Sequence, residues 1–427
     1  MISLKINVML AQYDADNAFE FKLTWLNDAI QLVHSRTTAS FLQIETKTIQ
    51  NIAYLLAYAG LQKTPFYLFD FSTSGSGKTE NAKKCRELFL APIFELQQKA
   101  LDEDHKKYSR IKNKDFTQLP KLHKCIHSTD CSVEALFESF ETIKSQYIEF
   151  GELGLTLKRT NTLIDYIVAG HGANTIFAPN FKNNRFNKSI KIENTSLFFY
   201  GDSNMEYMGT KTFFNHLKGG LINRCIVVFN QYERKFEELP RKYDLDYEEK
   251  KKYNDIAIDI VNFAKKNSTL EPIKEYENNP LVIQFEKTIY EKKKSLKNLG
   301  NDFYHLFHRS IQNFRAILHT IHYLNCFDKN TYSMIVSDET IKEAINFYKK
   351  IFFSYSHLID EINGVATELK NENQKQSIIN HLYRKENDLP FSLRDLYRLA
   401  HVNAKVARNA IKEIAVLDGN MIISIKS

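Results

Sequence analysis

A short segment rich in glycine and serine has the residue types that bind the phosphates of a nucleotide. The phosphate-binding loop (P-loop) follows the pattern G-x-x-x-x-G-K-[ST]; here Ser72 stands at the first glycine, and Gly77, Lys78 and Thr79 end the motif. Backbone N–H groups of such a loop surround the phosphates, the lysine reaches the β and γ oxygens, and the threonine hydroxyl binds Mg²⁺. The residues expected to contact ATP and Mg²⁺ are Ser74, Gly75, Ser76, Gly77, Lys78, Thr79 and Glu80.

Two elements must hold this loop in place. The run TPFYLFDF before it is short, apolar and aromatic, which predicts a strand, and KTENAKKCRELF after it predicts a helix. Strand, loop and helix in this order are what a P-loop requires, so a functional loop is favoured over a chance match. Ser72 lacks the freedom of glycine, so the chain must enter the loop in a conformation that serine can adopt.

The run YIEFGELG carries acidic residues at the end of a second predicted strand. ATP hydrolysis needs one carboxylate to hold Mg²⁺ and another to polarise the attacking water. Gly151 stands where the metal-holding aspartate is expected, and Glu152 follows it. Glu149 would point to the opposite side if the strand continued, so Glu152 is favoured as catalytic residue and metal ligand. A surface glutamate at a strand end is the alternative.

Polar residues also end a third predicted strand, SLFFYGDSN. A side chain at this point could sense the γ-phosphate or orient water. Asn204 is the first candidate, and Asp202 and Ser203 are close behind it. A plain polar turn explains the same residues equally well.

Two arginines later in the chain could complete a nucleotide site. Arg224, in GGLINRCIVVF, precedes the last predicted strand, where it could reach a nucleotide held by a neighbouring subunit. Arg315 lies on a predicted helix, where it could touch the γ-phosphate from above, and Arg309 is the alternative for this role. Surface ion pairs are the competing explanation for each arginine.

The order of predicted elements indicates the fold class and the domains. Apolar runs alternate with helical patterns up to Tyr232, which predicts an α/β fold with a mostly parallel sheet, and helical patterns dominate after it. We therefore expect an N-terminal helical preamble over 1–60, a P-loop ATPase core over 61–235, an α-helical lid over 236–369 and a C-terminal winged helix-turn-helix over 370–427.

Composition adds broad limits. Of the 427 residues 43% are hydrophobic, which can fill a large core. No apolar run could span a bilayer and the N-terminus lacks a signal-peptide pattern, so a cytoplasmic protein with no membrane partner is expected. The five cysteines have no disulfide framework spacing, and the net charge of +7 is compatible with a polyanion partner without indicating one.

Two groups of basic residues could contact nucleic acid. An Asn-Asn turn at 183–184 lies between two β-prone runs and predicts a basic hairpin. Its basic residues are Lys182, Arg185, Lys188 and Lys191. The second helix of the predicted helix-turn-helix would enter a major groove, and its candidate residues are Asn403, Lys405, Arg408 and Lys412. A solvated hairpin and a protein-binding winged domain are the alternatives.

The order of these motifs resembles that of the helicase-like ATPase domains encoded by phages, plasmids and integrated elements, often beside primase modules. Those domains are similar in turn to AAA+ helicases of the minichromosome-maintenance type. The resemblance covers Thr64 to Leu358, and only its P-loop is specific by itself. It rests on the P-loop, STDCSVEALFESF, YIEFGELG, the basic hairpin, SLFFYGDSN, GGLINR, HRSIQNFRAILH and ETIKEAINFYKK.

The resemblance implies an AAA+-like core and an ATP-dependent DNA helicase or translocase that acts in the replication of a mobile genetic element. Nucleotide would lie between the subunits of a ring, expected to be a hexamer, which acts on single-stranded or forked DNA. Gly151 and Ser72 depart from the family pattern, which bears on hydrolysis more than on nucleotide binding. The implied roles are nucleotide binding for Lys78 and Thr79, catalysis for Glu152, sensor 1 for Asn204, the arginine finger for Arg224 and sensor 2 for Arg315.

A nucleotide switch is the alternative from a different class: a regulatory or defence ATPase that binds DNA or a protein without unwinding, which Gly151 favours. Two local patterns carry less weight. SGSGKTENAKK is similar to the myosin phosphate loop, but a myosin motor is far longer and its switch motifs do not occur here in the required order. The spacing of His123, Cys125, His127 and Cys131 does not fit zinc.

Overall fold

The computed structural model contains two compact units, Met1–Leu358 and Ile359–Ser427, and the boundary between them falls within helix α14 (Asp338–Arg384). Each unit is considered by itself. The structure describes residues 17–110, 124–128, 131–158, 162–172, 175–177, 191–230, 239–270, 273, 276–298, 300–384, 390–393, 396, 411, 415–418 and 421–425.

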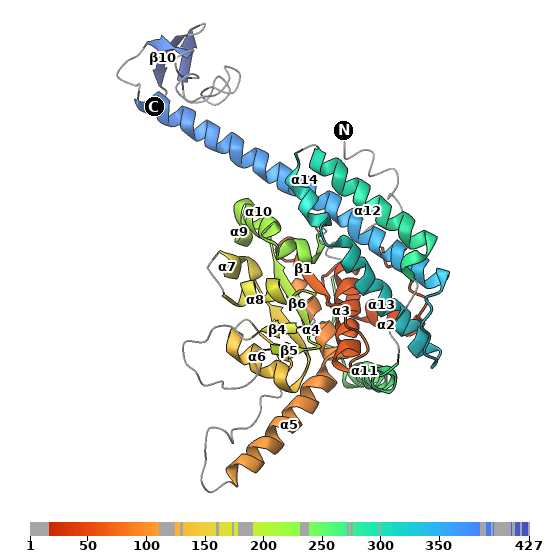
Figure 1. Cartoon of the computed structure of the whole chain (residues 1–427). Coiled ribbons are helices and arrows are strands. Elements are labelled where there is room, and N and C mark those ends of the chain that lie inside the picture. Colours follow the sequence, from red (N-terminus) through yellow and green to blue (C-terminus); the bar gives the residue numbers. More distant parts are fainter. Residues whose placement is uncertain are drawn as a thin grey trace. The chain divides into compact units, whose positions relative to one another are not determined.

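The first unit is built on a five-stranded sheet whose strands all run parallel (Figure 1). The strand order is β2-β3-β6-β1-β7, so β1 lies between β6 and β7, and β6 separates it from β3. The predicted α/β class with a mostly parallel sheet is therefore confirmed. The strands are β1 (Tyr67–Phe71), β2 (Ile126–His127), β3 (Ser145–Phe150), β6 (Ser196–Ser203) and β7 (Ile226–Val228).

These strands form from short apolar runs that can be covered on both faces. β1, β6 and β7 are buried at every residue. Continuous burial of this kind is typical of a parallel sheet with helices on both sides. Because parallel strands all end at the same edge, the loops after β1, β3 and β6 lie along one edge of the sheet.

Helices cover both faces of the sheet (Figure 1). On one face α3 (Phe41–Tyr58) packs against α4 (Lys78–Phe89) and contacts β1, β3 and β7. On the other face α7 (Leu153–Leu157) and α8 (Thr162–Gly170) contact β6. The P-loop is thus fixed between a buried strand and a helix that is itself packed on α3.

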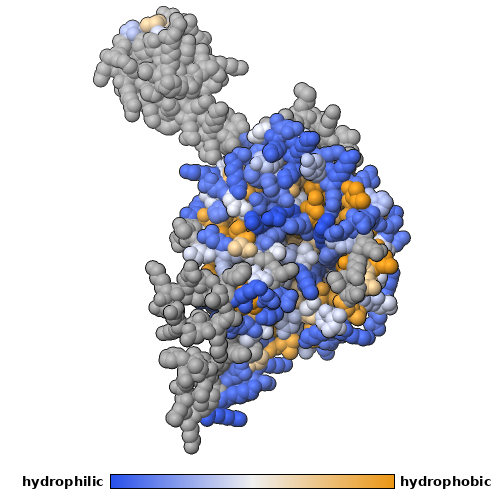
Figure 2. Space-filling model, viewed as in Figure 1, coloured by the Kyte–Doolittle hydropathy of each residue, from blue (hydrophilic) through white to orange (hydrophobic). Residues whose placement is uncertain are grey.

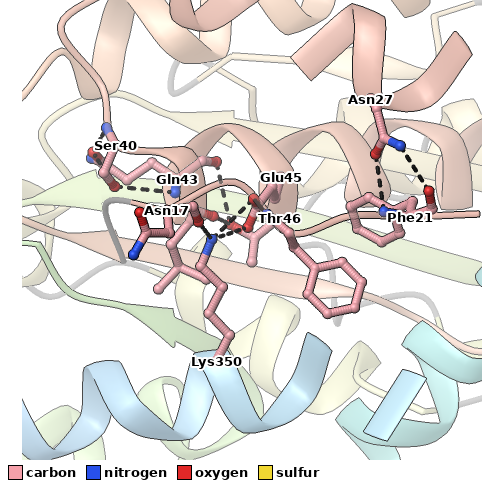
Figure 3. A network of polar contacts seen from close by, with 10 residues as sticks. Asn17, Phe21, Asn27, Ser40, Gln43, Glu45, Thr46 and Lys350 are labelled. Carbon is pink, nitrogen blue, oxygen red and sulfur yellow. Dashed lines mark hydrogen bonds and ion pairs between the residues drawn. The ribbon is translucent and has the colours of Figure 1, made fainter. Parts of the chain in front are cut away.

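α3 is buried from Leu42 to Ala57, and several of its polar side chains are paired inside the protein. Glu45 forms an ion pair with Lys350 of α14, with Nζ 2.7 Å from Oε2 (Figure 3). Gln50 Nε2 donates to the carbonyl oxygens of Phe66 and Phe199 at 3.1 and 2.7 Å. Since buried polar groups are costly unless they are hydrogen-bonded, these contacts fix α3 against the sheet.

Helices also form the part of the first unit that follows the sheet. The longest are α11 (Tyr247–Asn267), α12 (Pro280–Asn298), α13 (Ser310–Asp328) and α14. They occupy the region expected to form the lid, and their action as a lid stays a prediction. The other helices of the first unit are α2 (Thr24–His34), α5 (Ala91–Ser109), α6 (Val133–Thr142), α9 (Met205–Met208), α10 (Thr210–Gly219), η2 (Ile222–Arg224), η4 (Tyr276–Asn278) and η5 (Asp302–Phe307).

The second unit contains a three-stranded antiparallel sheet in the order β8-β10-β9. A small sheet of this kind is one component of the predicted winged domain, which stays a prediction. The strands are β8 (Phe391–Ser392), β9 (Ala415–Asp418) and β10 (Met421–Ile425). The candidate DNA-reading residues Asn403, Lys405, Arg408 and Lys412 lie outside the described residues.

The surface is mostly hydrophilic on the face shown in Figure 2, with small apolar patches between hydrophilic residues. Some large apolar side chains are exposed, such as Tyr247 and Ile335. Exposed apolar residues in small numbers are normal for a folded domain. None of the helices in the described ranges combines the length and the apolar character needed to cross a bilayer.

Candidate nucleotide-binding site

The loop between β1 and α4 has the backbone geometry of an anion-binding turn. Gly75 and Gly77 have φ angles of +79° and +74°, a left-handed conformation that glycine adopts readily. Gly77 is also the N-cap of α4, and no side chain caps this helix end. The first N–H groups of α4 are therefore left for an anion at the positive end of the helix dipole.

Gly77 is required by packing as well as by its φ angle. A Cβ at this position would lie 2.6 Å from the backbone N of Ala39 and 2.6 Å from Thr38 Oγ1. Thr38 Oγ1 in turn donates to the carbonyl oxygen of Gly75 at 3.3 Å. The segment before α3 therefore lies directly against the P-loop, a contact that the loop motif alone does not predict.

Ser72, at the place of the first glycine, anchors the loop. The described non-glycine residues with positive φ are Glu152, Asn194 and Asn330, so the backbone at Ser72 needs no glycine. Ser72 Oγ donates to Asp70 Oδ1 at 2.6 Å and accepts from the backbone N of Asn230 at 3.2 Å. The departure from the motif thus ties the loop entrance to the end of β1 and to the chain after β7.

Gln43 of α3 completes this anchor. Its Nε2 donates to Asp70 Oδ1 and Oδ2 at 3.1 and 2.9 Å. Asp70 is 2% exposed, and burial raises the pKa of its carboxyl group, against the effect of the nearby Lys78. The P-loop pattern predicts neither Gln43 nor Asp70. The sequence signal for Gln43 is its polar side chain inside a helix with an apolar pattern.

Lys78 lies over the loop. Its Nζ donates to the carbonyl oxygens of Ser72 and Thr73 at 3.0 and 2.8 Å. Phosphate oxygens would be stronger partners for this cation, because they carry negative charge whereas the carbonyl oxygens are neutral. Thr79 and Glu80 follow in the first turn of α4 and are exposed, as are Ser74 and Gly75 in the loop.

Buried polar atoms without a hydrogen-bond partner in the described residues occur around this loop. Such atoms are rare in folded proteins and call for an explanation. Those of the loop and its surroundings are Thr73 Oγ1, Ser76 Oγ, Asn81 Nδ2, Glu152 Oε2 and Asn204 Nδ2. Hydroxyl and amide groups can donate to phosphate oxygens, and Mg²⁺ prefers carboxylate and hydroxyl oxygens. The residues present therefore fit ATP together with Mg²⁺.

Glu152 lies at the same edge of the sheet. β3 ends at Phe150, and Glu152 has φ 52° and ψ 47°, a left-handed conformation that costs a non-glycine residue about 1–2 kcal/mol. Its backbone N donates to Asp202 Oδ1 at 2.8 Å, which stabilises the turn. Because the strand does not continue to Glu152, the alternation of sides cannot separate it from Glu149. Backbone strain of this kind is frequent at functional sites.

Contacts, rather than strand alternation, separate the two glutamates. Glu149 Oε1 accepts from Arg86 Nη1 at 2.8 Å, and Glu149 Oε2 lies 3.5 Å from Lys47 Nζ. Burial lowers the pKa of Lys47, and Glu149 opposes this effect. Glu149 therefore forms ion pairs with two cations of α3 and α4, whereas Glu152 has no ion pair among the described residues. Oε2 of each glutamate is buried without a hydrogen bond there, so the ion pairs make the difference.

The polar residues at the end of β6 have separate hydrogen-bonding tasks. Ser203 Oγ accepts from the backbone N of Gly154 at 3.1 Å. Asn204 Oδ1 accepts from the backbone N of Tyr207 at 2.9 Å and so caps α9. The Asn204 side chain is buried, and its Nδ2 has no partner in the described residues. Of these residues, Asn204 therefore keeps a donor for a phosphate.

Two buried carboxylates are neighbours across β1 and β6. Asp70 and Asp202 are paired in register, and each is 2% exposed. Burial raises the pKa of Asp202 to about 6; Asp70 and Glu152 add to the rise, and Lys78 and the N–H of Glu152 oppose it. Buried acids with raised pKa values beside a lysine are typical of functional sites.

Arg224 lies at the opposite end of the sheet from the P-loop of its own chain. Leu68 of β1 pairs with Ile226 of β7, so Arg224, which ends η2 two residues before Ile226, lies about level with Phe66. Six residues separate that level from Ser72, which at about 3.3 Å per residue is roughly 20 Å and exceeds the reach of an arginine. Arg224 Nη1 donates to the carbonyl oxygen of Gly220 at 2.6 Å, and no carboxylate of the described ranges pairs with it. Burial lowers the pKa of Arg224, and the positive charge of Arg309 lowers it further.

Arg315 is held by two carboxylates of its own helical region. Its Nη1 lies 2.9 Å from Glu277 Oε1, and its Nη2 lies 3.0 Å from Glu286 Oε1. One turn further along α13, His319 Nδ1 lies 3.2 Å from Thr64 Oγ1, which precedes β1. The structure therefore places Arg315 near the starting edge of the sheet and does not bring it to the P-loop of its own chain.

A cavity of about 250 Å³ lies at this starting edge of the sheet rather than at the P-loop. Lys63, His171 and Gln312 are among the residues that line it. Burial lowers the pKa of His171 to about 3, and Arg224 and Arg309 lower it further. The cavity therefore belongs to the surroundings of Arg224, and the nucleotide site is defined by the loop geometry instead.

The predicted basic hairpin is described at its base. β4 (Thr175–Phe177) and β5 (Lys191–Glu193) form an antiparallel pair. Lys191 forms an ion pair with Glu193, and both side chains are exposed. Lys182, Arg185 and Lys188 lie outside the described residues.

The histidine and cysteine residues near β2 are structural in the described ranges. His127 Nε2 lies 2.7 Å from Gln146 Oε1, and burial lowers the pKa of His127 to about 4. Cys125 and Cys131 are free thiols, as are the other three cysteines. No group of three or more metal-ligating side chains occurs in the parts of the chain that the structure describes, which do not include His123.

Fold and site together define a mixed α/β protein with a P-loop-like core. No protein-family model matches the chain, and no curated protein matches its sequence. Among solved structures, it is similar to SCCmec type IV Cch, described as an active helicase, with a TM-score of 0.32 and 11% sequence identity. That likeness covers 88% of this chain and 67% of the other, and it is too distant to carry a functional argument.

Proposed function

We propose that this chain is an ATPase that binds ATP and Mg²⁺ at the P-loop between β1 and α4. The proposal rests on the loop itself. Gly77 leaves the N-terminus of α4 without a side-chain cap, and Lys78 lies over the loop. Buried polar atoms around the loop have no hydrogen-bond partner among the described residues. The Thr79 hydroxyl and carboxylates such as Glu152 would hold Mg²⁺, which would neutralise the phosphate charge. Glu152 would orient the attacking water, and Asn204 would donate to a phosphate.

ATP turnover of the full chain with single-stranded DNA, compared with that of Lys78→Ala, tests the enzyme claim. The variant should lose turnover by a factor of about 100 or more, because a charge-stabilising donor at a reaction centre contributes on that scale. Binding of a fluorescent ATP analogue should weaken in parallel. Equal turnover in the two proteins would remove the ATPase proposal.

The site is completed, in this proposal, by Arg224 of a neighbouring copy in a ring. Arg224 is out of reach of its own P-loop, is half-buried, and has no carboxylate partner in the described ranges. A cation in that state is suited to a phosphate that another subunit holds. A head-to-tail interface that closes into a ring, such as a hexamer, would bring each Arg224 to the next nucleotide.

Mixing two inactive variants separates a shared site from an internal one. Lys78→Ala and Arg224→Ala should each be inactive alone. Random mixing would rebuild complete sites at about a quarter of the interfaces, so activity should return if Arg224 acts on a neighbour. An inactive mixture that still assembles would exclude this role of Arg224.

We further propose that the ATPase drives a DNA helicase or translocase involved in the replication of a mobile genetic element. Support comes from the motif order and from the paired base of the basic hairpin, where Lys191 is exposed. Cations of a hairpin can follow a phosphate backbone without reading sequence. Unwinding of a forked DNA, dependent on ATP and weakened by salt, is the expected result, and ATP turnover that ignores DNA would contradict it.

A nucleotide switch without unwinding is the second candidate. Gly151 stands where the metal-holding aspartate is expected, which favours slow hydrolysis of ATP. A switch would bind ATP, change its contacts with DNA or a protein partner, and hydrolyse slowly. Size measurement with and without ATP distinguishes the two: a persistent monomer that binds but does not turn over ATP favours the switch.

A further inference from the structure

Gly151, the first residue after β3, has no carboxylate where the metal-holding aspartate is expected, and the structure shows free space at this position. A Cβ at Gly151 would have no other atom within 4 Å. Gly151 is also not among the glycines with positive φ, so its backbone suits any residue. An aspartate would therefore fit at this position, and its absence has no steric reason.

Asp202 provides a carboxylate on the neighbouring strand at the same height. Phe150 is paired with Gly201, so Gly151 and Asp202 each come one residue after this pair. β6 lies between β3 and β1, which brings Asp202 closer than any residue of β3 to the strand that carries the P-loop. Its Oδ1 accepts from the backbone N of Glu152 at 2.8 Å.

The hydrogen bonds of Asp202 leave room for a cation, in contrast to those of Asp70. Asp70 accepts from Gln43 Nε2 at both oxygens and from Ser72 Oγ. Asp202 is buried to the same extent, but the described residues give it one hydrogen bond and no ion pair. A carboxylate has about four acceptor positions, and a buried one is costly unless it is paired. In the P-loop, the buried Ser76 hydroxyl has no hydrogen-bond partner among the described residues.

We infer that Asp202 supplies the Mg²⁺-holding carboxylate that Gly151 lacks. The inference rests on the proposed ATPase and assigns a residue within that site. Asp202 and the Thr79 hydroxyl are both oxygen ligands of the kind that Mg²⁺ takes, usually as one or two protein groups beside phosphates and waters. In this assignment the metal-holding carboxylate lies on β6 instead of at the end of β3, and Glu152 keeps its proposed role in orienting water.

Binding of Mn²⁺, followed by electron paramagnetic resonance with a non-hydrolysable ATP analogue present, tests this directly. Asp202→Asn should weaken Mn²⁺ binding at least about tenfold, on the scale of losses at metal sites, and leave metal-free binding of the analogue unchanged. The amide oxygen can still accept from Glu152, so the turn is preserved. Adding Gly151→Asp to this variant should restore most of the Mn²⁺ affinity, because the open space at Gly151 admits the side chain.

Glu149→Gln is the matched control, since Glu149 is the competing acid on β3 and is occupied by Lys47 and Arg86. Its Mn²⁺ affinity should equal that of the wild type. Unchanged Mn²⁺ affinity in Asp202→Asn, or a loss in Glu149→Gln instead, would overturn the inference and leave the ATPase intact. Failure of the wild-type chain to bind the analogue at all would overturn both.

Discussion

Lys350 and Glu45 form a buried ion pair that joins α14 to α3, with exposed side-chain fractions of 3% and 0%. Glu45 Oε1 also accepts from the backbone N of Phe19 at 2.6 Å, so one carboxylate holds the N-terminal segment as well. Glu45 stands two residues after Gln43, which binds Asp70 beneath the P-loop. The pair therefore fixes the helix on which the loop anchor depends.

Replacing Lys350 by methionine should destabilise the chain by about 3–5 kcal/mol, because it leaves Glu45 buried and unpaired. The double variant Lys350→Met with Glu45→Gln should recover part of the loss, since no isolated charge remains. Urea unfolding followed by circular dichroism measures both. A loss below about 1 kcal/mol in the single variant would mean that the pair is not buried as described.

Alanine at Gly75 and at Gly77 should have different effects. Both positions have positive φ, which costs alanine about 1–2 kcal/mol. At Gly77 the new Cβ would also overlap Ala39 and Thr38, whereas at Gly75 it meets nothing within 4 Å. Gly77→Ala should therefore lose more stability and more affinity for a fluorescent ATP analogue. Equal losses in the two variants would contradict the packing of the segment before α3 on the loop.

Acid should destabilise the chain partly through His127. Burial lowers its pKa from 6.5 to about 4 in the folded state. Between these pH values the unfolded chain binds a proton at this site and the folded chain does not, so stability falls as pH falls from 6.5 to about 4. The slope is about 1.4 kcal/mol per pH unit for one proton.

His127→Gln isolates this contribution, because its amide can still donate to Gln146 but cannot be protonated. The stability difference between wild type and variant, from urea unfolding at several pH values, should shrink as pH falls through that window. A difference that does not change with pH would show that His127 titrates normally.

Arg315→Met should cost about 1 kcal/mol or less, because the ion pairs with Glu277 and Glu286 leave Arg315 30% exposed. ATP turnover per chain should remain near the wild-type value, since the structure does not bring Arg315 to its own P-loop. A loss of turnover above about tenfold with unchanged stability would restore its predicted role as sensor 2.

The parallel sheet and the backbone geometry of the loop between β1 and α4 could be predicted from local sequence. An apolar run, two glycines, a lysine and a helical pattern in that order leave few other structures, because each residue type has a local backbone or burial preference. The sequence also showed that Gly151 stands where the metal-holding aspartate is expected. Contacts between distant segments could not be predicted: nothing in the order of residues links Gln43 to Asp70, or Thr38 to the loop.

Tertiary structure decided which polar residues are occupied and which are free. The sequence presents Glu149 and Glu152 as similar acids and Arg224 and Arg315 as similar arginines. Folding places two cations on Glu149 and two carboxylates on Arg315. Among the described residues it gives neither Glu152 nor Arg224 an ion pair. The sequence by itself determined the geometry of the loop between β1 and α4, because the backbone preferences of its residues are local. The choice among acids and arginines depends on charges brought together from separate helices, which only the packed chain defines.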